Sequence, residues 1–227
     1  MKRSQSGFTL IEIAIVLVII GLLLGGVLKG QELINSAKVK SLATDFRNIP
    51  VFIYGYQDKY KALPGDDKNV LINLGTLCAA PTSCTAGNGD GVIGVTDHAT
   101  DNWESIVVTD ETQQFWIDVR LAGLAPGATS GATDYRPLNA SGGVIGIQSA
   151  STSAPPITDV NGNPIRGSYV ICSSGILGKF VQQLDTTMDD GNPTTGSMLA
   201  GTGTGYPLTL ATLPLNEAGT YTVCMGI

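Results

Sequence analysis

The sequence contains few of the residues from which active sites and metal centres are usually built. It has one histidine, His98, and its four cysteines include no Cys-x-x-Cys pair. The sequence therefore does not offer the ligands of a common zinc site at their usual spacing. Spacing offers His98 no recognisable triad partner, and the glycine-rich run at 201–205 neither follows a strong strand nor opens a helix. We therefore expect a protein that is not an enzyme and requires no cofactor.

Basic residues are also scarce. The chain has 13 Lys and Arg residues against 19 Asp and Glu residues, which gives a net charge of −6. Two of the positive charges, Lys2 and Arg3, stand at the extreme N-terminus, so the rest of the chain is more acidic still. Because nucleic-acid binding relies on neutralising phosphates with basic side chains, we expect nucleic acid not to be the main partner.

The segment from Phe8 to Leu28 carries a single charge, that of Glu12. As a helix, a run of about 21 residues spans roughly 30 Å, the thickness of the hydrocarbon core of a bilayer. It is longer than the apolar core of a secretory signal peptide, about 7 to 15 residues. Lys2 and Arg3 precede it, which predicts a cytoplasmic N-terminus, one membrane span and an exported body.

Glu12 is the anomaly in this span. A carboxylate inside a membrane helix costs about 2.5 to 3.5 kcal/mol on insertion scales, so the acid needs either access to water or a partner. It could lie close enough to the cytoplasmic face to reach water. The residues around it provide a second interpretation.

The segment Gly7-Phe8-Thr9-Leu10-Ile11-Glu12 closely resembles the N-terminal signature of type IV pilins and type II secretion pseudopilins. The resemblance implies that residues 1–7 are a leader, that prepilin peptidase cleaves between Gly7 and Phe8, and that the new amino group of Phe8 is N-methylated. It also implies that Phe8 and Glu12 are the subunit assembly residues, with Glu12 neutralising the N-terminal amine of a neighbouring subunit. A carboxylate and an ammonium buried together cost far less than either alone.

Beyond residue 28 the apolar residues recur at spacings of 3 and 4, which predicts an amphipathic helix. Pro50 lies within this pattern and predicts a bend rather than a stop, because the pattern resumes in phase after it. The expected helix covers residues 8–60 and ends before a turn at 63–67. Its apolar stripe consists of Val39, Leu42, Phe46, Ile49, Ile53, Tyr56 and Tyr60.

Residues 61–227 form the expected head, in which short apolar stretches alternate with turn residues. We predict strands at 144–148, 168–172 and 220–225 with a weaker one at 206–210, helices at 110–124 and 177–188, and a flexible surface loop at 194–205. The fold class is therefore α+β. The resemblance implies the pilin lollipop, a long N-terminal helix packed on an antiparallel sheet, and similarities of segments 62–66, 115–124 and 184–191 to proteobacterial pilin-like proteins imply an enlarged head.

An even number of cysteines in an exported domain predicts disulfides. Spacing favours Cys78 with Cys84 and Cys172 with Cys224, although three pairings are open. The second pair also resembles the C-terminal disulfide of many pilins.

Two acidic segments raise the hypothesis of a calcium ion. Asn88, Asp90 and Asp97 stand where an EF-hand loop places oxygen ligands, but Ala86 occupies the first ligand position. A plain Asx and glycine turn explains the same residues. The second segment holds Asp185, Asp189 and Asp190 near the end of a predicted helix, where a cation would relieve their unfavourable interaction with the helix dipole; the alternative is a solvated helix end.

The function that these features favour is a structural subunit of a type IV pilus or pilus-like filament. The resemblance implies as partners copies of itself or related pilins, prepilin peptidase, an inner-membrane platform and an assembly ATPase. It also implies an inner-membrane precursor with a periplasmic head, and later a place in a pilus at the cell surface. The alternatives are a type II secretion pseudopilin, a minor pilin or adhesin with a ligand-binding head, and a permanently anchored, uncut periplasmic binding protein.

Overall fold

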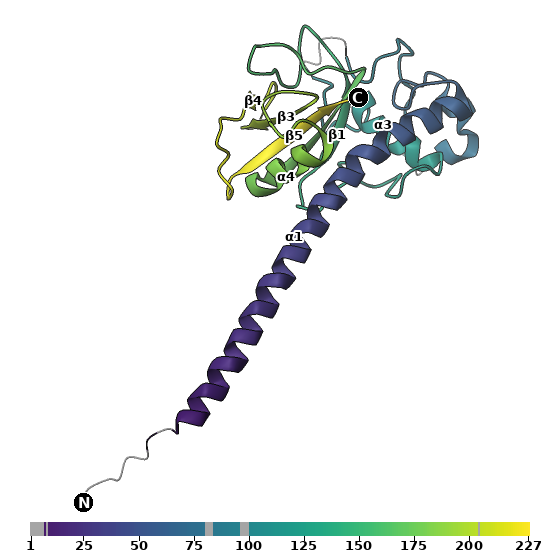
Figure 1. Cartoon of the computed structure of the whole chain (residues 1–227). Helices are drawn as coiled ribbons and strands as arrows, with labels where there is room; N and C mark the ends of the chain where they lie inside the picture. The colour runs from purple at the N-terminus through teal and green to yellow at the C-terminus, as the bar shows by residue number, and fades with distance from the viewer. Residues whose placement is uncertain (1–6, 8, 80–83, 96–99, 204) are drawn as a thin grey trace, which may run out of the picture. The chain divides into compact units, whose positions relative to one another are not determined.

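A computed structural model describes residues 7, 9–79, 84–95, 100–203 and 205–227. The chain divides into two compact units, Met1–Lys38 and Val39–Ile227 (Figure 1). One helix, α1 (Leu10–Tyr60), supplies the described structure of the first unit and continues into the second. It continues through Pro50, which confirms the prediction that the helix does not stop there.

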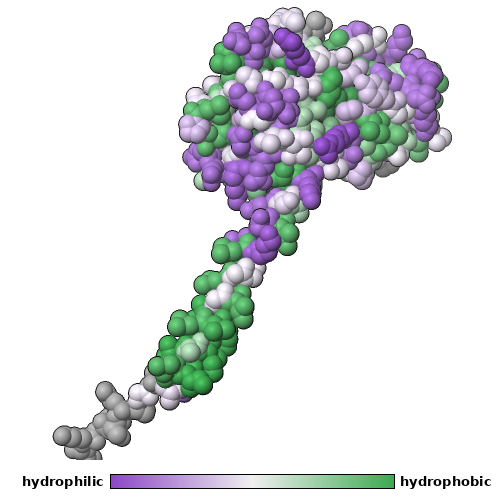
Figure 2. Space-filling view, viewed as in Figure 1, coloured by the Kyte–Doolittle hydropathy of each residue, from purple (hydrophilic) through white to green (hydrophobic). Residues whose placement is uncertain are grey.

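Within the first unit, α1 is apolar on every side from Ile13 to Leu28. All residues from 10 to 28 are exposed, including the consecutive Leu22, Leu23 and Leu24 at 72%, 64% and 59%. Figure 2 shows the visible face of this segment as an almost continuous apolar surface. By length and composition the helix could cross a membrane.

The part of α1 in the second unit is amphipathic. Its buried residues lie at spacings of 3 and 4 along one face, which confirms the predicted stripe as far as Tyr56; Tyr60 is half-buried. This face enters the main hydrophobic core, and the opposite face stays in solvent. The buried residues of α1 are Val39, Leu42, Ala43, Phe46, Ile49, Ile53 and Tyr56.

The described residues of the second unit contain a five-stranded antiparallel sheet in the order β1-β2-β5-β3-β4. The last strand of the chain therefore lies in the middle of the sheet (Figure 1). The strands are β1 (Ile145–Ser149), β2 (Tyr169–Leu177), β3 (Met198–Thr202), β4 (Thr209–Leu210) and β5 (Thr220–Gly226).

Side chains that alternate along the strands divide the core into two layers. Ile171 and Val223 belong to one face, which packs in the same cluster as α1, α3 (Glu111–Leu121) and α4 (Gly178–Met188). The opposite face carries Cys172 and Cys224 and is covered by residues of loops, among them Trp103, Ile157 and Leu208. Helices thus cover one side of the sheet, and irregular chain covers the other.

The prediction of a flexible surface loop over residues 194–205 is wrong. Residues Met198–Thr202 form β3, which pairs with both β5 and β4, and its first four residues are buried. The run of small residues is what this position requires, because a Cβ on Gly201 would approach Leu208 and Ile157 to within 2.8 and 3.0 Å. A glycine and threonine composition that resembles a loop is here a closely covered strand.

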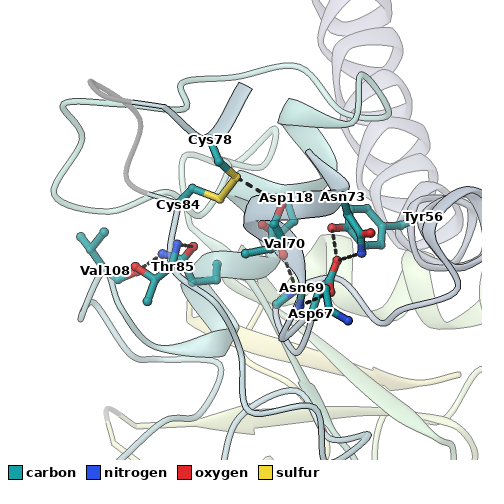
Figure 3. Close-up of a disulfide and its surroundings, with 12 residues drawn as sticks. Tyr56, Asp67, Asn69, Val70, Asn73, Cys78, Cys84, Thr85, Val108 and Asp118 are labelled. Carbon is teal, nitrogen blue, oxygen red and sulfur yellow. Dashed lines mark hydrogen bonds between the residues drawn. A yellow bond between two sulfur atoms is a disulfide. The ribbon is translucent and has the colours of Figure 1, made fainter. Parts of the chain in front are cut away.

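The other predicted elements are present with shifted bounds. The structure also contains two short elements that the sequence did not indicate, α2 (Val70–Asn73) and the 3₁₀ helix η1 (Gly75–Cys78). η1 ends at Cys78, which forms a disulfide with Cys84 (Figure 3). The second disulfide joins Cys172 to Cys224, which lie directly opposite each other on β2 and β5.

The Cys172–Cys224 disulfide should be the more important of the two for stability. It spans a sequence separation of 52, against 6 for Cys78–Cys84. In the chain-entropy model these separations correspond to about 4 and about 2 kcal/mol. We expect the double variant Cys172→Ala/Cys224→Ala to melt well below Cys78→Ala/Cys84→Ala in thermal denaturation of the full-length protein in detergent. Equal losses of melting temperature would show that loop-closure entropy does not determine how much each disulfide stabilises the fold.

Candidate functional site

The first turn of α1 holds Glu12 in a capping box. The Glu12 carboxylate accepts hydrogen bonds from the backbone amide of Thr9, at 2.8 Å, and from its hydroxyl, at 2.7 Å. In return the amide of Glu12 donates to the Thr9 hydroxyl at 3.3 Å. This reciprocal arrangement satisfies amides that would otherwise lack partners at a helix start. The sequence pattern Thr-x-x-Glu carries the signal for this box, which was not among the two roles expected for Glu12, access to water and contact with another subunit.

The capping box leaves Glu12 available to a second partner. Both donors of Thr9 bond the same oxygen, Oε2, and the residue is exposed. Gly7 is exposed as well, whereas Phe8 lies outside the described residues. In an isolated chain the acid therefore stabilises its own helix start, and its Oε1 can still accept from an ammonium group.

The first of the two calcium hypotheses falls on a loop that is held by two acids from elsewhere in the chain. Asp66 accepts hydrogen bonds from the amides of Gly89, Asp90 and Gly91, and Glu111 accepts from those of Asn88 and Gly94. Within the loop, Asn88 and Asp90 each accept from the amide two residues later. These are the Asx turns that the sequence allowed as the alternative.

Asp66, Asp90 and Glu111 form one of the two acidic clusters among the described residues whose geometry could hold a cation. Each carboxylate oxygen of Asp66 and Glu111 already accepts a backbone amide, so protein donors satisfy the two buried members. Asp97, the remaining acid of the calcium hypothesis, lies outside the described residues. Sequence reasoning missed Asp66 and Glu111 because no spacing rule connects them to a loop more than 15 residues away.

The second acidic cluster is the one that the sequence named. Ligand atoms of Asp185, Asp189 and Asp190 all lie within 4.8 Å of one another at the end of α4. Asp185 is fully buried, and neither of its carboxylate oxygens accepts a hydrogen bond. Burial raises the pKa of Asp185 to about 6, the Asp190 and Asp189 charges add to the rise, and the nearby amides of Gly191 and Asn192 offset it in part.

A third acidic group links the end of α1 to α3. Asp67 accepts hydrogen bonds from the hydroxyl of Tyr56 and the side-chain amide of Asn73, at 2.9 and 2.7 Å (Figure 3). Asp118 of α3 accepts the amide of Gly65 at 2.7 Å through one oxygen, while its other oxygen is buried without a partner. These bonds fix the Pro-Gly-Asp-Asp turn that follows α1.

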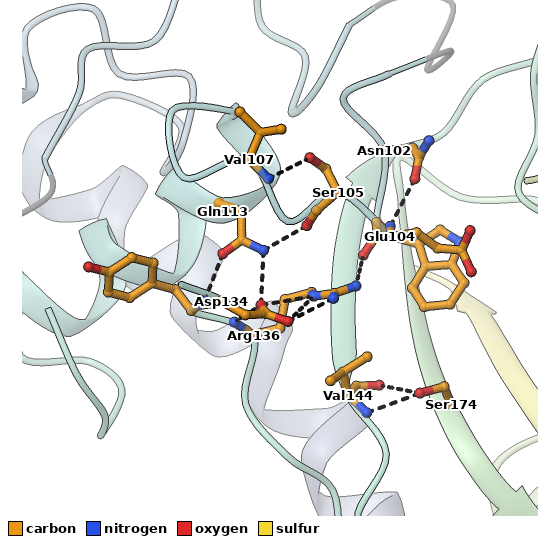
Figure 4. A network of polar contacts seen from close by, with 11 residues as sticks. Asn102, Glu104, Ser105, Val107, Gln113, Asp134, Arg136, Val144 and Ser174 are labelled. Atoms are coloured by element: carbon orange, nitrogen blue, oxygen red, sulfur yellow. Dashed lines mark hydrogen bonds and ion pairs between the residues drawn. The ribbon is translucent and has the colours of Figure 1, made fainter. Parts of the chain in front are cut away.

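An ion pair at the start of α3 has a structural role. Arg136 donates to both carboxylate oxygens of Asp134 and to the carbonyl of Trp103, and Gln113 also donates to Asp134 (Figure 4). Burial favours a higher pKa for Asp134, but the bonds from Arg136 and Gln113 outweigh it and lower the pKa. The charges are thus paired internally, and the pair joins two irregular segments to α3.

A comparison with protein families matches residues 2–28 to the prokaryotic N-terminal methylation motif. The match covers Gly7, Phe8 and Glu12 and ends inside the exposed apolar part of α1. In comparisons with the curated proteins and with the solved structures, nothing matches this chain. The match therefore lies wholly within the first unit.

The buried Asp118 should make stability depend on pH. Burial raises its pKa to about 8, the amide of Gly65 opposes the rise, and Asp67 adds to it. In an unfolded chain the pKa is about 3.9, so the folded state prefers the protonated form. The corresponding stability is complete below about pH 4 and is lost as the pH rises towards 8.

Asp118→Asn keeps an oxygen for the Gly65 amide and removes the charge. We expect this variant to match the parent at pH 4 and to exceed it by about 1 to 3 kcal/mol at pH 8, or about 2 to 4 °C of melting temperature per kcal/mol. Asp58→Asn is the control, because Asp58 is exposed and pairs only with exposed Lys61. Parallel pH profiles for Asp118→Asn and the parent would contradict this account.

Proposed function

We propose that the chain is a member of the type IV pilin and pseudopilin family and a structural subunit of a type IV pilus or pilus-like filament, because it carries the N-terminal methylation motif on a long apolar helix. Members of this family are typically structural and non-enzymatic. The partners in this proposal are copies of the chain or related pilins, with prepilin peptidase, an inner-membrane platform and an ATPase as the machinery.

The observation that carries the proposal is the exposed apolar segment of α1, residues 10–28. A helix that is hydrophobic on every side is stable only among apolar neighbours, which are lipids or other apolar helices. The inner membrane provides the first surroundings for the precursor, and packed helices of a filament provide the second. Transfer of the helix from the membrane to the filament exposes little apolar surface to water, because both environments exclude water from the same residues.

The capping box supports a specific role for Glu12 in this transfer. In the single chain, its Oε2 is bound by Thr9. Cleavage after Gly7 creates an ammonium group on Phe8, and Oε1 of Glu12 in an adjacent subunit can accept from it while Oε2 still caps its own helix. Because few axial offsets bring the two charges together, the pair also selects the register of neighbouring helices.

Processing is tested at the N-terminus of the protein isolated from cells. We expect mass spectrometry to find a chain that begins at Phe8 and carries one N-methyl group. In cells without prepilin peptidase the same chain should begin at Met1. A Met1 start in cells that contain the peptidase would favour the permanently anchored periplasmic protein instead.

Two substitutions of Glu12 separate its capping role from its charge. Glu12→Gln retains an oxygen for the Thr9 donors but has no charge, whereas Glu12→Ala has neither. If the ion pair drives assembly, both variants should be processed normally and should be lost from sheared filaments, by at least about tenfold, because a buried ammonium without its partner costs several kcal/mol. Normal incorporation of Glu12→Gln would show that the cap, and not the charge, is what matters.

The pseudopilin and minor-pilin alternatives predict different amounts of filament. A major subunit dominates the protein recovered from sheared surface filaments. A minor pilin or adhesin is present there at a small fraction, and a secretion pseudopilin gives no long surface filament at native expression. Electron microscopy of cells, with quantitation of the sheared material, therefore distinguishes the three.

A further inference from the structure

The two acidic clusters of the second unit differ in how their buried carboxylates are satisfied. In the cluster of Asp66, Asp90 and Glu111, the buried oxygens accept backbone amides at ordinary hydrogen-bond distances. In the cluster of Asp185, Asp189 and Asp190, the buried member accepts none. A buried carboxylate without a donor costs several kcal/mol, so Asp185 is the member of the second cluster that lacks a partner.

The position of Asp185 directs its carboxylate into the cluster. It lies on the last turn of α4, is fully buried, and its ligand oxygen lies within 4.8 Å of those of Asp189 and Asp190. Among the described residues, the ion pairs are Lys29–Glu32, Lys61–Asp58 and Arg136–Asp134, and none of them includes these three acids. Three carboxylates at the negative end of a helix repel one another and the dipole.

The segment after α4 is folded around these acids. Asp189 accepts the amides of Ser197 and Met198 through one oxygen, Oδ2. Asp190 accepts the amide of Asn192 and the hydroxyl of Thr195. The segment therefore returns to the end of α4 just where β3 begins, and it keeps the acids close despite their charges.

We propose that Asp185, Asp189 and Asp190 bind a divalent cation, with calcium preferred over magnesium, at the junction of α4 and β3. Oxygens that share one calcium ion lie about 2.3 to 2.6 Å from it, so two ligands on opposite sides are separated by roughly 5 Å. The observed spread of the three ligand atoms fits this limit. Water and backbone carbonyls would complete the six to eight oxygens that calcium takes, whereas magnesium requires a stricter octahedron and keeps more of its water.

The bound ion would give the buried Asp185 carboxylate a positively charged partner, and it would link two elements of the fold. Asp185 belongs to α4, while Asp189 is bonded to the first residue of β3. A cation at this site would therefore fix the position at which β3, an interior strand of the sheet, begins. Exported domains bind calcium with dissociation constants of about 0.1 to 1 mM, near the concentration outside cells.

The test uses the full-length protein in detergent, stripped with a chelator and melted with and without added metal. At about 10 mM calcium we expect the melting temperature to rise by about 3 to 10 °C, and magnesium should give less than half of this rise. Asp190→Asn, at an exposed position, should reduce the calcium-induced rise at least by half. No rise with calcium, or an equal rise in Asp190→Asn, would overturn the proposal.

Asp185→Asn gives a sharper result, because the variant and the parent should exchange their order of melting temperature between chelator and calcium. In chelator, the neutral side chain removes charge repulsion, so the variant should melt above the parent. In calcium the parent should melt above the variant. The matched control is Asp90→Asn, the exposed member of the other cluster, which should keep the whole calcium-induced rise. If Asp90→Asn loses the rise and Asp185→Asn keeps it, the proposed site is wrong.

Discussion

The second unit depends on the burial of one face of α1 between Val39 and Tyr56. The residues of this face are almost completely buried, and those from Val39 to Ile53 share a hydrophobic cluster with β1, β2, β5, α3 and α4, whereas Tyr56 packs with Val70 and Leu74. Every residue of the same helix from 10 to 29 is exposed. One continuous element therefore has two different requirements, a folded partner at its C-terminal end and an apolar environment on all sides at its N-terminal end.

The acids of the second unit act mostly as internal partners for backbone amides. Residues 61–110 contain only two short helical elements in their described part, so sheet pairing cannot satisfy many of their amides. Asp66 and Glu111 accept such amides, and Asp101 accepts those of Glu111 and Thr112 at the start of α3, where the N-cap residue Asp110 makes no side-chain cap bond. The acidic composition of the chain thus has a structural cause, independent of any external partner.

The sequence predicted the parts of the fold that have a strong period or a strong turn. The helix over α1, its buried stripe, the strands at 144–148 and 220–225, and the helices α3 and α4 could be found because apolar spacing sets them. β3 could not, since its glycines and threonines serve close packing and give no alternating pattern. The same limit applies to the sites. Glu12 stood out as a lone charge in an apolar run, whereas Asp66 and Glu111 contact their loop only through the tertiary fold.

The place of β5 in the sheet has a consequence for the order of events during biogenesis. β3 and β4 connect to β1 and β2 only through β5, which is made from residues 220–226. These two of the five strands therefore cannot join the rest of the sheet until residues 220–226 are in place. A chain that has been synthesised only as far as β4 can form α1 and yet lacks a joined sheet, so this topology places completion of the sheet late in synthesis.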